Sequence, residues 1–119
     1  VSELKRLAVP ASVDSIPSSA MQEDHVSMGW SAGRKLRRAV DGVTRVLAIE
    51  ALAAARAIEL RAPLQPAAAT TAVVRALRDA GVPGPGADRY LSPDIETTTA
   101  LVRDGGVVAA AQDAVGVLH

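Results

Sequence analysis

The middle of the chain carries a long helical pattern of apolar residues. Spacings of four and three alternate along it, which places these side chains on one face of an α helix and predicts a helix over residues 30–61. A second apolar face, formed by Val46, Ile49 and Leu52, indicates that the helix is buried on more than one side. The residues of the first face are Leu36, Val40, Val43, Leu47, Ala51, Ala54 and Ile58.

Such a helix is longer than a small domain requires. At about 1.5 Å per residue, some 32 residues span roughly 48 Å, whereas a domain of this length has a radius of gyration of roughly 14 Å. The helix therefore suits the interior of a larger helical bundle or an oligomer interface. Its alanine-rich stretch, residues 51–57, allows a neighbouring helix to approach closely.

The aromatic content supports the same interpretation. The 119 residues include no Phe, one Trp and one Tyr, although aromatic side chains usually provide the largest pieces of buried area in a core. Small aliphatic side chains bury less area each, while the backbone entropy lost per residue is undiminished. We therefore expect one partial domain that completes its core with sequence from elsewhere.

Composition also excludes several classes of protein. Thirteen Lys and Arg residues balance 13 Asp and Glu residues, which argues against a nucleic-acid or membrane-surface partner. The absence of cysteine excludes disulfides, thiolate metal sites and cysteine nucleophiles. The most apolar run, residues 46–58, is too short to span a bilayer and contains Glu50 and Arg56. With no targeting segment in view, a cytoplasmic protein is expected.

The segments on either side of the long helix are less regular. Pro10, Pro17 and several serines interrupt any periodicity over residues 1–29, so a loop with a helical turn near residues 4–7 is expected there. Pro63 and Pro66 end the long helix, since neither fits a helix interior.

Short helices are expected over residues 62–119. One covers 67–80 with Gly81 as its C-cap. Another covers 92–104, with Ser92 as its N-cap and Asp94 near the positive end of the helix dipole. The last residues form a short helix or a fraying tail. Because no strand alternation of useful length occurs, the predicted fold class is all-α, with one long central helix and several shorter ones.

Few polar residues are arranged as a site. Residues 34–38 form a basic cluster that could contact phosphate, but a solvated helix surface is the better interpretation at zero net charge. The densest polar cluster is Gln-Glu-Asp-His at 22–25. It lacks the spacing of a zinc motif and no second cluster accompanies it, so no metal site is predicted. On pattern alone, the start of a helix is the simplest interpretation of this cluster.

A family resemblance changes that interpretation. Residues 10–29, Pro-Ala-Ser-Val-Asp-Ser-Ile-Pro-Ser-Ser-Ala-Met-Gln-Glu-Asp-His-Val-Ser-Met-Gly, closely resemble the motif that begins the C-terminal part of histidine ammonia-lyases. Segments 46–50, 57–61 and 88–95 are similar to the same family, so the resemblance extends over nearly the whole chain. We therefore interpret 1–29 as an active-site loop segment, 30–61 as a long bundle helix and 62–119 as a short-helix region.

The resemblance implies an all-α enzyme whose long helices bundle at the centre of a homotetramer. It implies non-oxidative removal of ammonia from L-histidine, giving trans-urocanate in histidine degradation. The family's electrophile is methylideneimidazolone (MIO), formed from an internal Ala-Ser-Gly. No such triplet occurs in this sequence, in which the nearest match is Ala11-Ser12-Val13. No residue of this chain is therefore expected to form the cofactor, and the electrophile is expected in the remainder of a longer lyase.

The resemblance further implies a catalytic and substrate-binding role for Glu23. Related phenylalanine lyases have Gln at this place. A carboxylate can accept the N–H of an imidazole ring, whereas a phenyl ring offers it nothing. Glu23 therefore favours histidine as the substrate, with room for a role in proton transfer. Gln22 is predicted to line the substrate site, and Asp24 and His25 to orient the loop.

Two departures from the family motif lie beside these residues. Ser18 stands where the family usually has Thr, which keeps the hydroxyl, and Met21 stands where it usually has Asn or Gly.

Two alternatives stay open. The chain could be a non-catalytic helical oligomerisation module or a relic of the family, which keeps the bundle helices without the chemistry. A related lyase for another imidazole amino acid would suit Glu23 equally. In the leading interpretation the chain is about a quarter of an enzyme and inactive alone. Its partners are then L-histidine, the remainder of the lyase chain and further subunits of a homo-oligomer.

Overall fold

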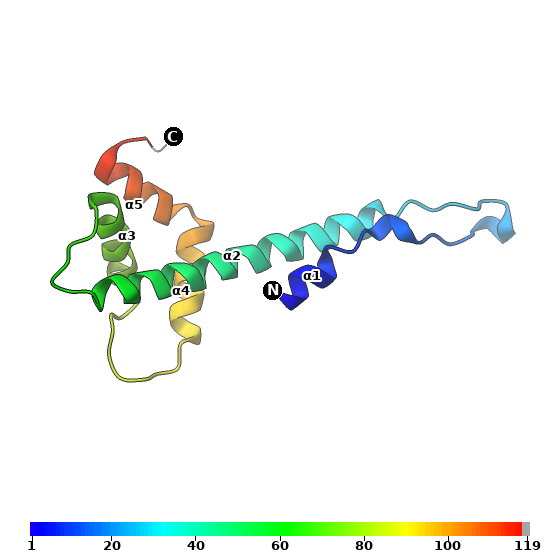
Figure 1. Ribbon diagram of the computed structural model, residues 1–119. Coiled ribbons are helices and arrows are strands. Elements are labelled where there is room, and N and C mark those ends of the chain that lie inside the picture. Colours follow the sequence, from blue (N-terminus) through cyan, green and yellow to red (C-terminus); the bar gives the residue numbers. More distant parts are fainter. Residues whose placement is uncertain (118–119) are drawn as a thin grey trace. The chain divides into compact units, whose positions relative to one another are not determined.

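Helices account for the regular structure of residues 1–117, which are the residues that the computed structural model describes (Figure 1). Two short 3₁₀ turns precede the long helix, at Ala11–Val13 and Ser19–Met21. Within these residues the only β pairing is a single isolated bridge, so the predicted all-α class is confirmed. The α helices are α1 (Ser2–Leu7), α2 (Gly29–Glu59), α3 (Ala68–Asp79), α4 (Ser92–Arg103) and α5 (Gly106–Val115).

Helix α2 confirms the long helix that the apolar periodicity predicted. It contains 31 residues and ends two residues before the predicted boundary, in turns that lead to Pro63. Its buried residues are Ala48 and Ala55, as expected where another segment approaches a helix at small side chains. The larger apolar side chains of its two predicted faces are largely exposed in this chain: Leu36, Val40, Val43, Val46, Leu47 and Ile49. Their burial therefore requires atoms beyond residues 1–117.

The chain forms two compact units, Val1–Val43 and Thr44–His119, each of which makes most of its contacts within itself. In the first unit, α1 lies against the first part of α2. Leu4 occupies the space beside Gly42, where an added Cβ would lie 2.8 Å from a Leu4 methyl carbon. Lys35 Nζ donates to the Val9 carbonyl. None of residues 1–43 is buried, so this unit has almost no core of its own.

The second unit contains the hydrophobic core of the described residues. Leu77 of α3 and Val82 are buried against Ala55 of α2, and Leu52, Val74 and Leu101 pack around them. Helix α5 packs against both α3 and α4. This unit therefore buries apolar side chains from elements that are distant in sequence.

A tight turn after α3 brings Val82 back over Leu77. The Val82 N–H donates to the Leu77 carbonyl (3.0 Å), and the Gly81 N–H donates to the Arg78 carbonyl (2.9 Å). Gly81 has a φ of +89°, the left-handed conformation that favours glycine just after a helix. Helix α3 lies within the predicted range 67–80, but its C-cap residue is Ala80, so the predicted cap at Gly81 is wrong by one residue.

The start of α4 corrects one prediction and adds a partner to a second residue. Its N-cap residue is Leu91 rather than Ser92, and no side chain caps it. Asp94 lies in the first turn as predicted, but it is buried and accepts hydrogen bonds from Arg89, at 3.0 Å from Nε and 2.8 Å from Nη2. The helix-dipole argument did not reveal this partner, because Arg89 reaches Asp94 only through the conformation of the preceding loop.

The last helix of the chain agrees with the sequence-based prediction. Of the two predicted forms of the last residues, the structure shows the short helix, α5, which begins at Gly106, and residues 118–119 lie outside the described residues. No helix in the described part of the chain has both the length and the hydrophobicity that a membrane crossing requires.

Candidate functional site

The motif at 22–25 lies on the loop that joins α1 to α2. In space this loop projects past the N-terminal end of α2 (Figure 1). A serine holds the base of this loop. Ser15 Oγ accepts the Val26 N–H at 2.8 Å and donates to the Val26 carbonyl at 3.2 Å. One hydroxyl therefore satisfies both backbone groups of a residue that lies 11 positions away.

A second serine holds the tip of the loop. Ser18 and Glu23 form an antiparallel bridge, with N–H to carbonyl distances of 2.9 Å and 3.2 Å in the two directions. The Met21 N–H also donates to the Ser18 carbonyl at 3.0 Å. These backbone bonds close a tight turn over the four residues between Ser18 and Glu23.

The turn itself has an uncommon backbone conformation. Ser19, Ala20 and Met21 have φ values of +51°, +54° and +74°, and none of them is glycine. The left-handed conformation costs an ordinary residue about 1–2 kcal/mol, and only Gly, Asn and Asp adopt it readily. Met21 therefore occupies the position where the resemblance implies Asn or Gly, and the structure gives that preference a physical reason.

The Glu23 carboxylate is fixed on one side and open on the other. Its Oε2 accepts a hydrogen bond of 2.8 Å from Ser18 Oγ. The residue is exposed, and an ionised carboxylate has capacity for further donors on its second oxygen. The arrangement can accept an N–H from a ligand without losing the bond to Ser18.

The other three motif residues flank Glu23 in the sequence and are exposed. Gln22 is exposed next to Glu23, where it could line a site. Asp24 and His25 are exposed as well, and His25 borders a shallow depression with Ser12 and residues at the start of α2. Among residues 1–117, no group of three or more His, Cys, Asp or Glu side chains is placed to hold a metal ion.

The side-chain bonds at the base and tip of the loop come from Ser15 and Ser18. Sequence reasoning assigned Ser15 no role beyond interrupting periodicity, and indicated for Ser18 only that it keeps the hydroxyl of the family's Thr. The signal that could have found Ser18 is its hydroxyl, which matches the family's Thr at that position. The pairing across the turn was not predictable, because it depends on three successive left-handed residues of which none is glycine.

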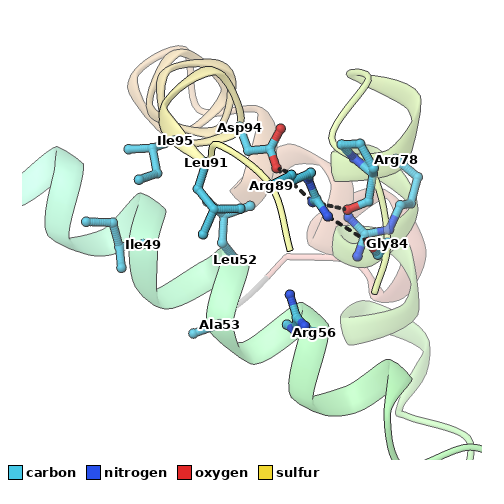
Figure 2. Close-up of a pocket in the computed structure, with 11 residues that line it drawn as sticks. Ile49, Leu52, Ala53, Arg56, Arg78, Gly84, Arg89, Leu91, Asp94 and Ile95 are labelled. Atoms are coloured by element: carbon cyan, nitrogen blue, oxygen red, sulfur yellow. Dashed lines mark hydrogen bonds and ion pairs between the residues drawn. The ribbon is translucent and has the colours of Figure 1, made fainter. Parts of the chain in front are cut away.

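A separate pocket of about 240 Å³ lies in the second unit, between α2, the loop after α3 and the start of α4 (Figure 2). Ile49, Leu52 and Ile95 supply apolar surface. Arg89, which Figure 2 shows bonded across the loop, donates to Asp94 and to the Gly84 carbonyl (3.4 Å). Sequence analysis singled out no site residue in this pocket.

A second arginine at this pocket also ties the chain together. Arg78 forms an ion pair with Glu59 at the end of α2, and its Nη1 donates to the Val82 carbonyl at 3.0 Å. Both arginines therefore fix the loop between α3 and α4.

The basic cluster at 34–38 lies on the first part of α2. Lys35 is engaged with the Val9 carbonyl, and Arg34, Arg37 and Arg38 are exposed. This placement agrees with a solvated helix surface.

Comparison with known proteins identifies the family. The family model "Aromatic amino acid lyase" matches residues 1–79, which include the loop, all of α2 and α3. The chain belongs to the aromatic amino acid lyase family. The match includes both serines and the whole 22–25 motif.

Individual relatives of this lyase family agree. Histidine ammonia-lyase of Streptomyces avermitilis is 66% identical over 118 residues, covering 99% of this chain and 23% of the relative. Histidine ammonia-lyase of Symbiobacterium thermophilum is 55% identical over 119 residues, again covering 23% of the relative. The chain thus spans about a quarter of the length of the curated lyases it matches.

Solved structures of the family share the fold. Histidine ammonia-lyase from Trypanosoma cruzi superposes with a TM-score of 0.85 at 40% identity, over 96% of this chain and 22% of that chain. Tyrosine aminomutase from Streptomyces globisporus superposes with a TM-score of 0.84 at 33% identity, over 95% of this chain and 22% of that chain. Two enzymes with different names fit the backbone equally well, so the fold alone does not select a reaction.

Proposed function

We propose that this chain is the C-terminal portion of a histidine ammonia-lyase, which eliminates ammonia from L-histidine to give trans-urocanate. The observation that carries the proposal is the 66% identity to a histidine ammonia-lyase over 99% of this chain. The lower identity to tyrosine aminomutase, 33%, disfavours the aminomutase reaction.

In this proposal Glu23 binds the imidazole ring of the substrate through a hydrogen bond. Its carboxylate stands at the tip of the loop with one oxygen held by Ser18. The second oxygen accepts an imidazole N–H, with charge assistance when the ring is protonated. Gln22, adjacent and exposed, lines the same site. The chain thereby contributes recognition of the ring, and Glu23 is also placed to exchange a proton with it.

The residues of this chain do not fit the family's MIO cofactor. The nearest match to Ala-Ser-Gly is Ala11-Ser12-Val13, which ends in a residue with a branched side chain and lies in the 3₁₀ turn Ala11–Val13. We infer that the electrophile comes from lyase sequence outside this chain, and that the complete site also requires the apolar faces of α2 to be covered in an oligomer.

A chimeric enzyme tests the proposal. In this chimera the chain replaces the matching segment of the Streptomyces avermitilis histidine ammonia-lyase, and urocanate formation from L-histidine is followed by absorbance. We expect the chimera to be active and the 119-residue chain alone to be inactive. Turnover by the isolated chain would refute the inferred external electrophile, and an inactive but correctly assembled chimera would refute the proposed function.

The role of Glu23 is tested in the same chimera. Glu23→Ala is expected to lower kcat/KM by about 100-fold or more, the range for losing a charged hydrogen-bond acceptor or a proton-transfer group. Glu23→Gln is the matched control, because it preserves size and an acceptor oxygen while removing the charge. An undiminished rate in Glu23→Ala would remove Glu23 from the site.

The alternative of a non-catalytic oligomerisation module is favoured by the exposed apolar faces of α2. It predicts that the isolated chain self-associates, and that the chimera assembles without forming urocanate. Size-exclusion chromatography together with the urocanate assay separates it from the lyase proposal.

A further inference from the structure

We propose that Ser18 is a positioning residue for Glu23, which it holds with one carboxylate oxygen occupied and the other free for the substrate. This inference rests on the proposed role of Glu23 and assigns a function to a hydroxyl that lies outside the Gln-Glu-Asp-His motif.

The backbone places these two side chains on one side of the turn. Ser18 and Glu23 exchange both of their N–H to carbonyl bonds, at 2.9 Å and 3.2 Å. Residues paired in this way in an antiparallel bridge project their side chains to the same face, with Cβ atoms about 5 Å apart. A serine hydroxyl therefore reaches the carboxylate directly, and the observed Oγ to Oε2 distance is 2.8 Å.

The left-handed turn makes this pairing possible. The residues between Ser18 and Glu23 must reverse the chain within four positions, and Ser19, Ala20 and Met21 do so at positive φ. Strained backbone of this kind persists only where the surrounding bonds support it. Here the supporting bonds are the bridge and the Met21 N–H bond to the Ser18 carbonyl.

The hydroxyl matters because Glu23 is otherwise free to move. An exposed glutamate side chain that becomes ordered on binding loses rotamer entropy. The Ser18 bond restricts that freedom before the substrate arrives, as preorganisation requires. It also satisfies one carboxylate oxygen, so that a single open oxygen faces an incoming N–H donor.

The test uses Thr and Val at position 18 in the chimera described above. These two side chains have nearly the same shape, and only Thr carries the hydroxyl. We expect Ser18→Thr to retain most of the activity, and Ser18→Val to raise KM for L-histidine about tenfold relative to Ser18→Thr, with a smaller change in kcat. The reason is that the imidazole contact is present in both the bound substrate and the transition state.

A double-mutant cycle shows whether Ser18 acts through Glu23. In the Glu23→Ala background, Ser18→Val is expected to change kcat/KM by less than about twofold, because the group that it positions is absent. Ser12→Ala, an exposed serine on the same loop, is the matched control and is expected to leave KM unchanged. Ser18→Ala repeats the test with a smaller side chain if Val disturbs assembly.

The possible outcomes separate the two proposals. A wild-type KM in both Ser18→Val and Ser18→Ala, while Glu23→Ala is impaired, overturns the positioning role and leaves the proposed function standing. If Ser18→Val lowers kcat/KM by the same factor with Glu23 and in the Glu23→Ala background, the positioning role is also overturned, because the effect then does not depend on the carboxylate. A lower kcat with unchanged KM in Ser18→Val means loss of folded enzyme and counts against it too. Full activity in Glu23→Ala overturns both proposals.

Discussion

The two units of this chain hold their structure by different means. In Val1–Val43 no residue is buried, and the loop is held by serine hydroxyls and backbone hydrogen bonds. In the unit that begins at Thr44, Leu77, Val82 and Ala55 form a core, and Arg78 and Arg89 tie a loop to two helices. The residues that the family resemblance assigns to chemistry all lie in the unit without a core.

This difference separates the unit that carries the site loop from the unit that carries the hydrophobic core. A loop held by local hydrogen bonds can present Glu23 at an exposed tip, but it cannot exclude water around a substrate. Large apolar side chains in the first unit, such as Leu36 and Val40, are exposed, which is a liability in a monomer and typical of a surface that another segment covers. The second unit has a hydrophobic core of its own around Leu77 and Val82, although Leu47 and Ile49 are exposed there as well.

Core truncation should give the largest effect on stability and would sharpen this contrast. Leu77 is 0% exposed and Leu36 is 65% exposed. Leu77→Ala is expected to cost about 2–5 kcal/mol in the free energy of unfolding, since it removes buried contacts and leaves a cavity. Leu36→Ala should cost less than about 0.5 kcal/mol in the isolated chain. Urea unfolding followed by circular dichroism measures both.

The same pair of variants also tests whether α2 is covered in an assembled lyase. In the chimera, Leu36→Ala should become destabilising by about 2 kcal/mol or more, because its side chain is then buried. Equal effects of the two variants in the isolated chain would break the contrast between the units. An unchanged small effect of Leu36→Ala in the chimera would show that this face stays exposed.

The ion pairs of the second unit should give intermediate effects. Asp94→Ala removes a largely buried carboxylate and leaves Arg89 without its charged partner, with side-chain exposures of 11% for Asp94 and 29% for Arg89 in the intact pair. The expected cost is about 1–3 kcal/mol. Glu96 lies on the same helix as Asp94, and Glu96→Ala breaks an exposed ion pair with Arg45 of α2, which should cost less than about 1 kcal/mol. Thermal unfolding of both variants checks the order, and a larger loss for Glu96→Ala would contradict it.

Relief of strain in the site loop should give a small effect, and in the opposite direction. Met21 is 77% exposed with a φ of +74°, so Met21→Asn loses little apolar burial and gains a residue that tolerates this conformation. The expected gain is about 0.5–1 kcal/mol in local stability. Hydrogen exchange of the Met21 and Glu23 amides, both bonded to Ser18, should slow by about two- to fivefold. Faster exchange would show that Met21 is not strained. Met28→Asn, outside the turn, is the control.

Much of this outcome was predictable from local patterns. Alternating spacings of four and three located α2 to within two residues, and Pro and Gly located the ends of the shorter helices. The loop motif led to the lyase family, which the comparisons confirm. Patterns of this kind succeed because helix formation and helix termination depend on residues a few positions apart.

The sequence by itself therefore determined the helices, their order and the family, while only the tertiary structure showed what holds each unit together. It paired Asp94 with Arg89 rather than with the helix dipole alone, and replaced the predicted cap at Ser92 with Leu91. It also joined Ser18 to Glu23 across a left-handed turn. These contacts depend on how loop backbone folds back in space, and no spacing along the chain encodes the direction in which a strained turn brings two side chains together.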